Sequence, residues 1–392
     1  MVAVILSKPV RSLSSESFIS CLLTQSFDQL FSASALCKAR KKINVVFFQH
    51  LFDIIASMPS FSKKWKGYFV YAIDGCKVKI SNNKDCIDQF GVNSNQHSNQ
   101  AMLLLVAKFN VFSKFFRSFI PKNVNTNERD FALEMLINED QKKKILLYDR
   151  GFGSFFFIHQ HLISSSDFII RVHARFNKAL MDFLKTDKND GIITLKITDN
   201  ARNYYKKNEL ELPTQDEMKV RVIRYKIEGK NNDKDYILLT SLDHKAASIN
   251  DLKYLYSKRW TIETAFGILK NSLYLEVPSG NPPQIILQDL YAAFILFNIS
   301  AHIHIENQAK IKAISAQRKY EYQVCYQSLI SSIRFCIHQL LNPKFYKKTL
   351  NFINQFILSN LSPIRPNRSY KRRQTTRGSN SRYHPSPNFK FN

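Results

Sequence analysis

The order of predicted strands and helices between residues 68 and 172 limits the fold more than any other feature of the chain. Three extended segments rich in aromatic and β-branched residues come first, over Tyr68–Ile80, Ala101–Phe109 and Phe115–Pro121. A helix, a strand, a helix and a strand are predicted next, over Glu128–Asn138, Lys144–Tyr148, Phe155–Ser164 and Asp167–Val172. The apolar run Lys144–Tyr148 does not alternate, which is typical of the buried centre of a sheet. We therefore expect an α/β fold.

Three strands, a helix, a strand, a helix and a strand is the order of elements in a ribonuclease-H-like fold. Two carboxylates occupy informative places in this order. Asp-Gly pairs are most often turns, but a turn at Asp74-Gly75 would break the first strand. We therefore favour a functional role for the Asp74 carboxylate, with Gly75 leaving room for DNA. Asp149 follows the carboxyl end of the buried strand, which is where functional sites in α/β folds are usually found. An Asp at this place can also be a helix cap.

A third carboxylate lies on a predicted helix over Tyr256–Lys270. This stretch has no proline, and its apolar residues recur at helical spacing. On a helical wheel with about 100° per residue, Arg259, Glu263 and Lys270 fall at roughly 300–340° from Tyr256, beside an apolar face. The helix can therefore bury one face and align a carboxylate, two cations and a phenol along its edge. An ordinary solvated face is the simpler alternative.

The spacing Tyr256-x2-Arg259-x3-Glu263-x6-Lys270, with Asp74 and Asp149 upstream, resembles the signature of the DDE transposases of insertion-sequence family four. The run from Tyr148 to Phe152 also matches a sequence block of that family, and the resemblance covers about Ser32 to the tail. It implies that Asp74, Asp149 and Glu263 are the catalytic, metal-binding carboxylates. It also implies that Tyr256, Arg259 and Lys270 bind transposon-end DNA and that Arg150 contacts DNA near the active site.

The chemistry of phosphodiester cleavage explains why three carboxylates are needed. Two divalent ions about 4 Å apart can activate the attacking oxygen and stabilise the leaving oxygen. Mg2+ is a hard ion that prefers carboxylate oxygens and keeps positions for water or substrate phosphate. We therefore expect two Mg2+ ions, for which Mn2+ can substitute.

The net charge of +26 and the pI of about 9.8 favour a polyanionic partner, and nucleic acid is the first candidate. A membrane surface is a weaker alternative, because no basic amphipathic helix lies at either end. The apolar segment Ile285–Ile305 contains four polar residues, so it is predicted to be a buried helix instead of a membrane span. The six cysteines form no CxxC pair, which indicates free thiols in a reducing cytosol. A signal peptide is not expected, and we place the protein in the bacterial cytoplasm, associated with the nucleoid.

The chain is predicted to have six parts. They are a helical N-terminal DNA-binding region (1–60), the first part of a ribonuclease-H-like core (61–173), a β-rich insertion (174–245), the catalytic helix of the core (246–275), a helical C-terminal region (276–362) and a basic disordered tail (363–392). The N-terminal helices, over Ser15–Phe27 and Ser32–Ser57, could instead be purely structural, and the tail could be a solvated segment without DNA contacts. Strands are expected in the insertion over Ile192–Ile197, Val220–Ile227 and Tyr236–Thr240, and C-terminal helices over Gln284–His302 and Glu321–Leu341.

These patterns favour a transposase that cuts at the ends of its own mobile element and joins them to target DNA. The expected partners are the terminal inverted repeats, the target DNA and a second copy of the protein in a synaptic dimer. The alternatives are a ribonuclease-H-like nuclease without strand transfer and a catalytically inactive DNA-binding relative. The family uses a tryptophan in the insertion to stack on a flipped base of a hairpin end, but only Trp65 and Trp260 occur here. Trp260 is one candidate for stacking, and Tyr204, Tyr205 and Tyr225 are the others.

Overall fold

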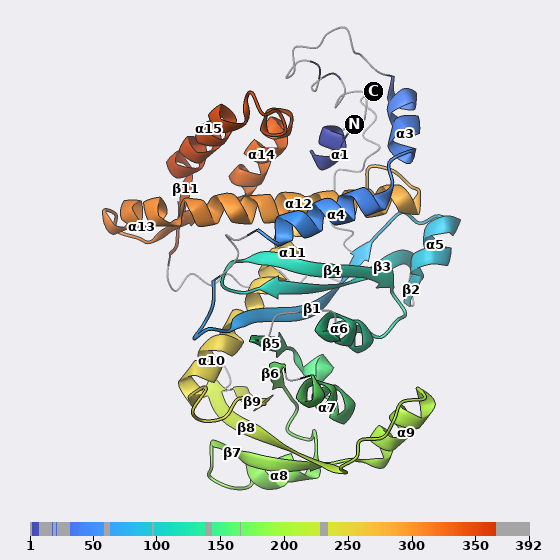
Figure 1. Ribbon diagram of the computed structural model, residues 1–392, viewed down its shortest axis with the longest axis vertical. Coiled ribbons are helices and arrows are strands. Elements are labelled where there is room, and N and C mark those ends of the chain that lie inside the picture. The colour runs from blue at the N-terminus through green and yellow to red at the C-terminus, as the bar shows by residue number, and fades with distance from the viewer. Residues whose placement is uncertain are drawn as a thin grey trace.

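The computed structural model describes residues 2–7, 18, 21, 32–58, 63–95, 98–137, 143–164, 166–227 and 234–365. Within these residues, a nine-stranded mixed sheet runs in the order β2–β3–β1–β5–β6–β9–β8–β7, with β4 paired to β3. Figure 1 shows helices on both sides of this sheet. The helix predicted over Ser15–Phe27 and the tail beyond residue 365 lie outside the described residues, apart from residues 18 and 21.

The central five strands confirm the predicted α/β fold with a mixed sheet. β1 (Phe69–Lys79) pairs antiparallel with β3 (Ser98–Asn110) and parallel with β5 (Lys144–Tyr148). β4 (Phe115–Asn123) is antiparallel to β3, and β6 (Asp167–Arg171) is parallel to β5. The order β4–β3–β1–β5–β6 and these directions are those of a ribonuclease-H-like sheet.

Side chains alternate between the two faces of the sheet, because successive residues of a strand point to opposite sides. In β1, Val70 and Ala72 belong to one buried core, and Tyr71 and Ile73 belong to the other. Every residue of β5 is buried, with its side chains divided between both cores. This burial on both faces explains why β5 has an unbroken apolar run after Lys144.

The first core is covered by α4 (Val45–Ala56), α11 (Trp260–Asn271) and α12 (Pro283–Glu306), and the second by α6 (Glu128–Ile137) and α7 (Phe155–Ile163). α4 packs along α12 across the sheet (Figure 1). α12 is long and apolar enough to span a membrane, but 83% of its most apolar window is buried within the protein. It is therefore the buried helix that the sequence predicts.

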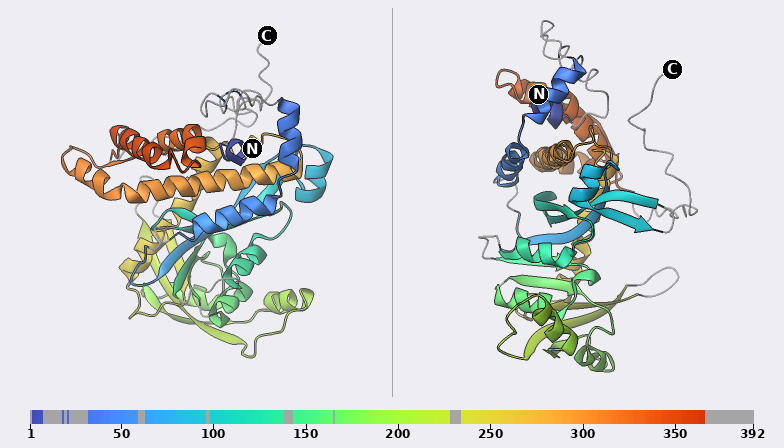
Figure 2. Two further views of the ribbon diagram at one scale, coloured as in Figure 1. Left: turned by 45° about the horizontal axis from the view of Figure 1, so that its top comes forward. Right: turned by 90° about the vertical axis from the view of Figure 1, so that its right-hand side faces the viewer.

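The strands predicted between residues 174 and 245 are present and extend the central sheet. β9 (Lys234–Thr240) pairs with β6, β8 (Glu217–Ile227) pairs with β9, and β7 (Asp190–Lys196) pairs with β8, all antiparallel. Two helices in this part were not predicted, α8 (Lys178–Leu184) and α9 (Asp199–Lys207). Figure 2 shows that these strands lie at the opposite end of the molecule from α14 and α15.

The flanking regions are largely helical, but two of the predicted helices begin or are interrupted at other residues than predicted. The helix predicted over Ser32–Ser57 is two helices, α3 (Ala33–Lys41) and α4, because the Asn44 side chain caps the start of α4 by accepting a bond from Val46 N–H. The helix predicted over Glu321–Leu341 begins only at Tyr326, because residues 322–324 pair with a distant strand. The remaining elements are α1 (Val2–Leu6), α5 (Lys84–Phe90), β2 (Val92–Asn95), α13 (Gln308–Ala316), β10 (Tyr322–Val324), α14 (Tyr326–Leu340), α15 (Tyr346–Ser359) and β11 (Leu361–Pro363).

The helix predicted over Tyr256–Lys270 is broken at Arg259. α10 (Ile249–Lys258) ends one residue before it, and α11 begins one residue after it. Two backbone hydrogen bonds at this point join residues three apart instead of four. Arg259 N–H donates to Tyr256 O at 3.1 Å, and Ile262 N–H donates to Arg259 O at 3.2 Å. The turn is therefore tighter than an α-helical turn, and the prediction of one uninterrupted helix is wrong.

Candidate active site

Asp74 lies where β1 continues beyond the end of its parallel neighbour. The last paired residues of β1 and β5 are Ala72 and Leu147, whereas β1 keeps its pairing with β3 through Asp74↔Ala107 and Gly75↔Val106. Asp74 and Gly75 are therefore part of an unbroken strand, as predicted. Residues two apart in a strand point to the same face, so the side chain of Asp74 points with those of Val70 and Ala72 toward the face covered by α11.

Asp149 directly follows β5 and starts the short 3₁₀ helix Arg150–Phe152. It occupies the N-cap position of that helix, but its side chain makes no capping hydrogen bond. The alternative role of helix cap is therefore not the one that its carboxylate has in the structure. Arg150 is exposed at the same loop.

One buried guanidinium lies between two of the three carboxylates. Arg259 has an exposed fraction of 2%, and its Nη2 lies 2.8 Å from Glu263 Oε1 and its Nη1 3.4 Å from Asp74 Oδ2. Burial alone would lower the pKa of Arg259, but Tyr256, the bond to Glu263 and the charges of Asp149 and Asp74 together raise it. Asp74 and Glu263 therefore pair with this guanidinium, and Asp149 acts on it through its charge.

The site holds more negative charge than Arg259 neutralises. Burial raises the pKa of Asp74 to about 7, against the lowering effect of Arg259, and the neighbouring charges of Glu128 and Glu263 add to the rise. Burial also raises the pKa of Glu128, with a further contribution from Asp149. Burial and the neighbouring carboxylates therefore both make Asp74 and Glu128 harder to ionise.

Glu128 is a residue that the sequence interpretation missed. It is the first residue of α6, and the Gly75 N–H that donates to Asp74 Oδ1 at 3.0 Å also lowers the pKa of Glu128 by hydrogen bonding. In the sequence it is only an acidic residue at the start of a predicted helix, which is common because acids stabilise helix N-termini. The space that Gly75 leaves open is occupied by the Glu128 carboxylate, so the interpretation that Gly75 makes room for DNA is wrong.

The predicted DNA-binding residues are divided between the buried site and the surface. Tyr256 is 2% exposed, and among the described residues its hydroxyl and the Arg259 Nε have no hydrogen-bond partner. Lys270 donates to Lys77 O at 2.8 Å and to Glu276 Oε1 at 3.1 Å. Trp260 is 46% exposed, and the Arg259 guanidinium lies 4.7 Å from its ring centroid.

The residues present suit a divalent cation in their chemistry. Carboxylate oxygens with an excess of negative charge are the donor set that hard cations prefer. In the part of the chain that the structure describes, no three His, Cys, Asp or Glu residues are already grouped closely enough to hold a metal ion. Arg259 supplies the positive charge between Asp74 and Glu263 instead, so an ion bound by both carboxylates would have to displace it.

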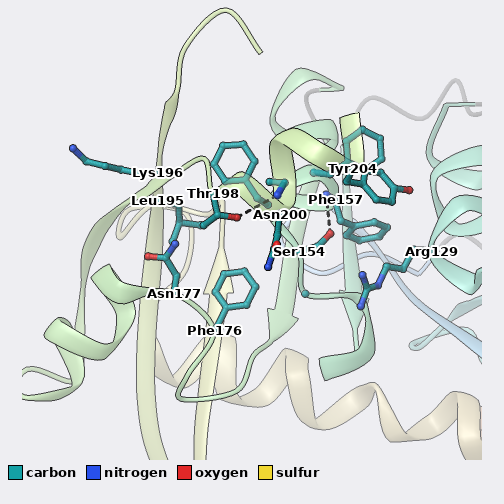
Figure 3. Close-up of a pocket in the computed structure, with 14 residues that line it drawn as sticks. Arg129, Ser154, Phe157, Phe176, Asn177, Leu195, Lys196, Thr198, Asn200 and Tyr204 are labelled. Carbon is teal, nitrogen blue, oxygen red and sulfur yellow. Dashed lines mark hydrogen bonds between the residues drawn. The ribbon is translucent and has the colours of Figure 1, made fainter. Parts of the chain in front are cut away.

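A cavity of about 330 Å³ lies between α7, α9 and β7, and none of the predicted carboxylates lines it. Figure 3 shows Arg129, Ser154, Phe176, Asn177 and Tyr204 around it. Arg129 follows Glu128 in the chain and donates from Nε to Gly151 O at 2.7 Å, which connects the cavity wall to the loop of Asp149. Aromatic walls with amide and cationic groups at the rim suit a flat polar ligand.

The chain was compared with known proteins. A family model described as "Transposase DDE domain" matches residues 65–281. No curated protein matches the chain. Among solved structures, the cryo-EM structure of a piggyBac transposase synaptic complex with hairpin DNA has 10% sequence identity and a TM-score of 0.44, covering 91% of this chain and 75% of that chain. That likeness is too weak to support an argument about this chain.

Proposed function

The chain belongs to the transposase DDE domain family, and from this premise we propose that it cuts DNA at the ends of a mobile element and joins the freed ends to target DNA. The family model covers the segment that carries Asp74, Asp149 and Glu263. The spacing of Tyr256, Arg259, Glu263 and Lys270 supports a finer placement in insertion-sequence family four.

The observation that carries the proposal is that the Arg259 guanidinium pairs with both Asp74 and Glu263, while Asp149, directly after β5, acts on the same guanidinium through its charge. DDE domains generally use divalent metals, and these three residues would hold two Mg2+ ions. When bound, such ions supply charge stabilisation for the attacking and leaving oxygens of the phosphodiester. Asp74 in β1 and Glu263 in α11 are held on regular elements, which fix side-chain positions better than loops, and Asp149 directly follows β5.

Arg259 and Tyr256 support the binding of end DNA at the same place. The Arg259 Nε and the Tyr256 hydroxyl are buried donors without a partner among the described residues, and buried donors normally have one. A phosphate oxygen is an acceptor for both, and a planar guanidinium suits phosphate geometry. Lys270 would join them after exchanging Glu276 for a phosphate, and Arg150 would reach DNA from its exposed position.

We propose further that excision passes through a hairpin end with one base turned outward. Tyr204 lines the 330 Å³ cavity and Trp260 is 46% exposed, so both rings are accessible for stacking. The other two candidates fit less well. Tyr205 is 1% exposed, and its hydroxyl is hydrogen-bonded to His159 Nδ1. Tyr225 is already stacked on Tyr236, with their ring centroids 5.4 Å apart.

Variants at these four aromatic residues test the hairpin step. Stacking is worth about 1–3 kcal/mol per base, so Tyr204→Ala or Trp260→Ala should reduce hairpin yield on a denaturing gel by roughly tenfold. Tyr225→Ala serves as the comparison and should retain hairpin formation. Linear ends without any hairpin from the wild type would reject the hairpin route, and equal yields from all variants would reject this choice of residues.

The proposed partners are the terminal inverted repeats, the target DNA and a second copy of the chain in a synaptic dimer, in the bacterial cytoplasm. The predicted division into a helical N-terminal region, a core with an insertion and a helical C-terminal region is part of the same proposal. A strand-transfer assay with pre-cut ends and Mg2+ tests it. Joined products are expected, whereas cutting without joining would indicate a ribonuclease-H-like nuclease and binding without cutting an inactive relative.

A further inference from the structure

A second cavity lies on the opposite side of α11 from the candidate active site. Its volume is about 450 Å³, and it forms where α11, α12, the turn between β3 and β4, and the pair β10–β11 meet. Its wall on α11 contains Thr261, Thr264 and Ile268. At about 100° per residue, these side chains fall at roughly 100–160° from Glu263 on the helix. α11 therefore directs Glu263 toward one site and two threonines toward another.

The wall of this cavity is part apolar and part polar. Phe109, Phe297 and Val324 provide buried apolar side chains, each no more than 3% exposed. Amide and hydroxyl groups come from residues that include Gln323 and Ser362, and no Asp or Glu is among the described residues of the wall. The volume is within the range of about 300–1,000 Å³ that is usual for ligand sites. These surfaces match a ligand that has a flat apolar part and a negative charge.

Lysine ammonium groups supply positive charge around the cavity. Lys114, in the turn between β3 and β4, is part of the wall. Lys258 is next to the wall, because its carbonyl accepts a hydrogen bond from Thr261 Oγ1 at 2.7 Å. Partial burial lowers the pKa of Lys114, and the positive charges of Lys258 and Lys63 lower it further. Among the described residues, no carboxylate pairs with Lys114, and Lys63 donates to the Gln308 amide. Like charges without an acidic partner favour the binding of an anion.

A nucleotide combines the two properties that the cavity requires. Its phosphate is an anion that ammonium groups bind as point charges, and its base is a flat ring that can pack against apolar side chains. Trp260 lies between the two sites, because it falls at roughly 60° from Glu263 on the helix. Its ring is 46% exposed, so a DNA strand can cross the start of α11 over a surface on which bases stack.

We propose that the cavity of Lys114, Thr261 and Thr264 holds one unpaired nucleotide of a DNA strand, with its base against the apolar wall and its phosphate at Lys114. This inference rests on the proposed function, because the DNA at the candidate active site would supply the strand. It adds a contact on the face of α11 opposite Glu263, which the Tyr-Arg-Glu-Lys spacing does not include.

Cys325 allows occupancy to be measured at the cavity itself, because its side chain is part of the wall. Burial acts to raise the pKa of Cys325, but hydrogen bonds, chiefly with Ser328, lower it overall. A lower thiol pKa favours the thiolate, which is the form that iodoacetamide alkylates. Cys336 lies further along α14 and outside the cavity wall, so it is an internal reference in the same chain.

The test measures alkylation of Cys325 relative to Cys336 by mass spectrometry in the full chain, with a single-stranded thymidine octanucleotide as the probe. At ten times its Kd, the strand should slow alkylation of Cys325 about tenfold, since about one cavity in ten stays free. The same strand paired with its complement should protect less, because its bases are not free. Lys114→Gln should raise the Kd for protection about tenfold by removing a charged contact. Lys348→Gln, exposed on α15 and outside the cavity, removes the same charge and should keep the wild-type Kd.

Fluorescence anisotropy shows separately whether the octanucleotide binds anywhere on the chain. Binding without protection of Cys325 would overturn the inference and leave the proposed function intact. Equal protection by the duplex, or an unchanged Kd in Lys114→Gln, would also overturn it. Protection by thymidine monophosphate but not by the octanucleotide would identify a free nucleotide as the ligand and contradict the strand. No binding of the octanucleotide or of the element ends would overturn both the inference and the proposed function.

Discussion

At the scale of single residues, Arg259 determines the electrostatics of the candidate site. Its guanidinium is 2% exposed and lies within 2.8 Å of Glu263 and 3.4 Å of Asp74. It supplies the positive charge that allows neighbouring carboxylates to ionise close together. A divalent cation at the same place would compete with it, so binding of metal and movement of Arg259 are expected to be linked.

Replacing Arg259 by Gln should make the protein without DNA depend more strongly on divalent cations. The carboxylates would lose their internal counter-charge, so the unfolding temperature in EDTA should fall below that of the wild type. Mg2+ should then raise it by more than it raises that of the wild type. Differential scanning fluorimetry measures both shifts, with Lys258→Gln as the control on the adjacent, partly exposed residue. An identical Mg2+ response in Arg259→Gln and wild type would contradict this role.

Lys270 is expected to bind DNA only by giving up a partner within the protein. Its ammonium contacts Glu276 Oε1 at 3.1 Å and Lys77 O at 2.8 Å. Lys270→Ala should weaken binding to a pre-cut end and reduce the salt slope by about one, and Glu276→Gln should strengthen binding at low salt. Fluorescence anisotropy across a salt titration measures the slopes. An unchanged slope in both Lys270→Ala and Arg259→Ala would show that neither contacts phosphate.

At the scale of elements, α7 contains a buried histidine that affects stability through pH. His161 is 0% exposed and lies among the rings of Tyr148, Phe157 and Phe168. Burial lowers its pKa to about 3. The unfolded chain therefore binds a proton below pH 6.5 that the folded protein does not bind until about pH 3, so the free energy of unfolding falls as pH decreases through this range.

His161→Gln should make stability less sensitive to acid. Between pH 7 and pH 5 the wild type should lose roughly 2 kcal/mol more of its free energy of unfolding than the variant, as an upper value for this pKa difference. Urea unfolding at the two pH values provides the comparison. Equal losses in both proteins would show that His161 is not the group responsible. The variant's lower stability at pH 7 does not affect this difference.

Elements with a clear apolar pattern could be predicted from the sequence, and those that depend on distant contacts could not. β5, with its apolar run after Lys144, and the long α12 lie close to their predicted bounds. α9, with its sequence DNARNYYKK, is too polar to show a buried face, and only Tyr205 is buried in it. β10 forms because it pairs with β11, a contact that local sequence does not encode.

The same distinction separates the site residues. Asp74, Asp149 and Glu263 could be proposed from the sequence because the family resemblance and their places in the predicted elements point to them, and the structure pairs two of them, Asp74 and Glu263, with Arg259. Glu128 could not be predicted, since it meets the site only through its contact with Gly75. The break at Arg259 could not be predicted either, because the local sequence allows an uninterrupted helix and the ion pair of Arg259 with Asp74 is a long-range contact.

At the scale of the whole molecule, one sheet connects the candidate site to both ends of the structure. β7, β8 and β9 continue it on one side, and α12 with α4 covers it on the other side, where α14 and α15 are stacked (Figures 1 and 2). The site thus lies on the central part of this sheet, where β1 and β5 carry Asp74 and precede Asp149. With a net charge of +26, the chain should bind DNA with an affinity that decreases steeply with salt.

Cleavage of a supercoiled plasmid that carries the ends of the mobile element is the most direct test of the proposed activity. The wild type should cut this plasmid with Mg2+ and not with EDTA. Asp74→Asn, Asp149→Asn and Glu263→Gln should each reduce the rate by roughly a thousandfold or more, because each removes a charge that holds the cation, while gel-shift affinity for the ends stays close to wild type. Near wild-type cutting by any of the three variants would contradict the assignment of that carboxylate, and cutting by all three would contradict a DDE active site at this sheet edge.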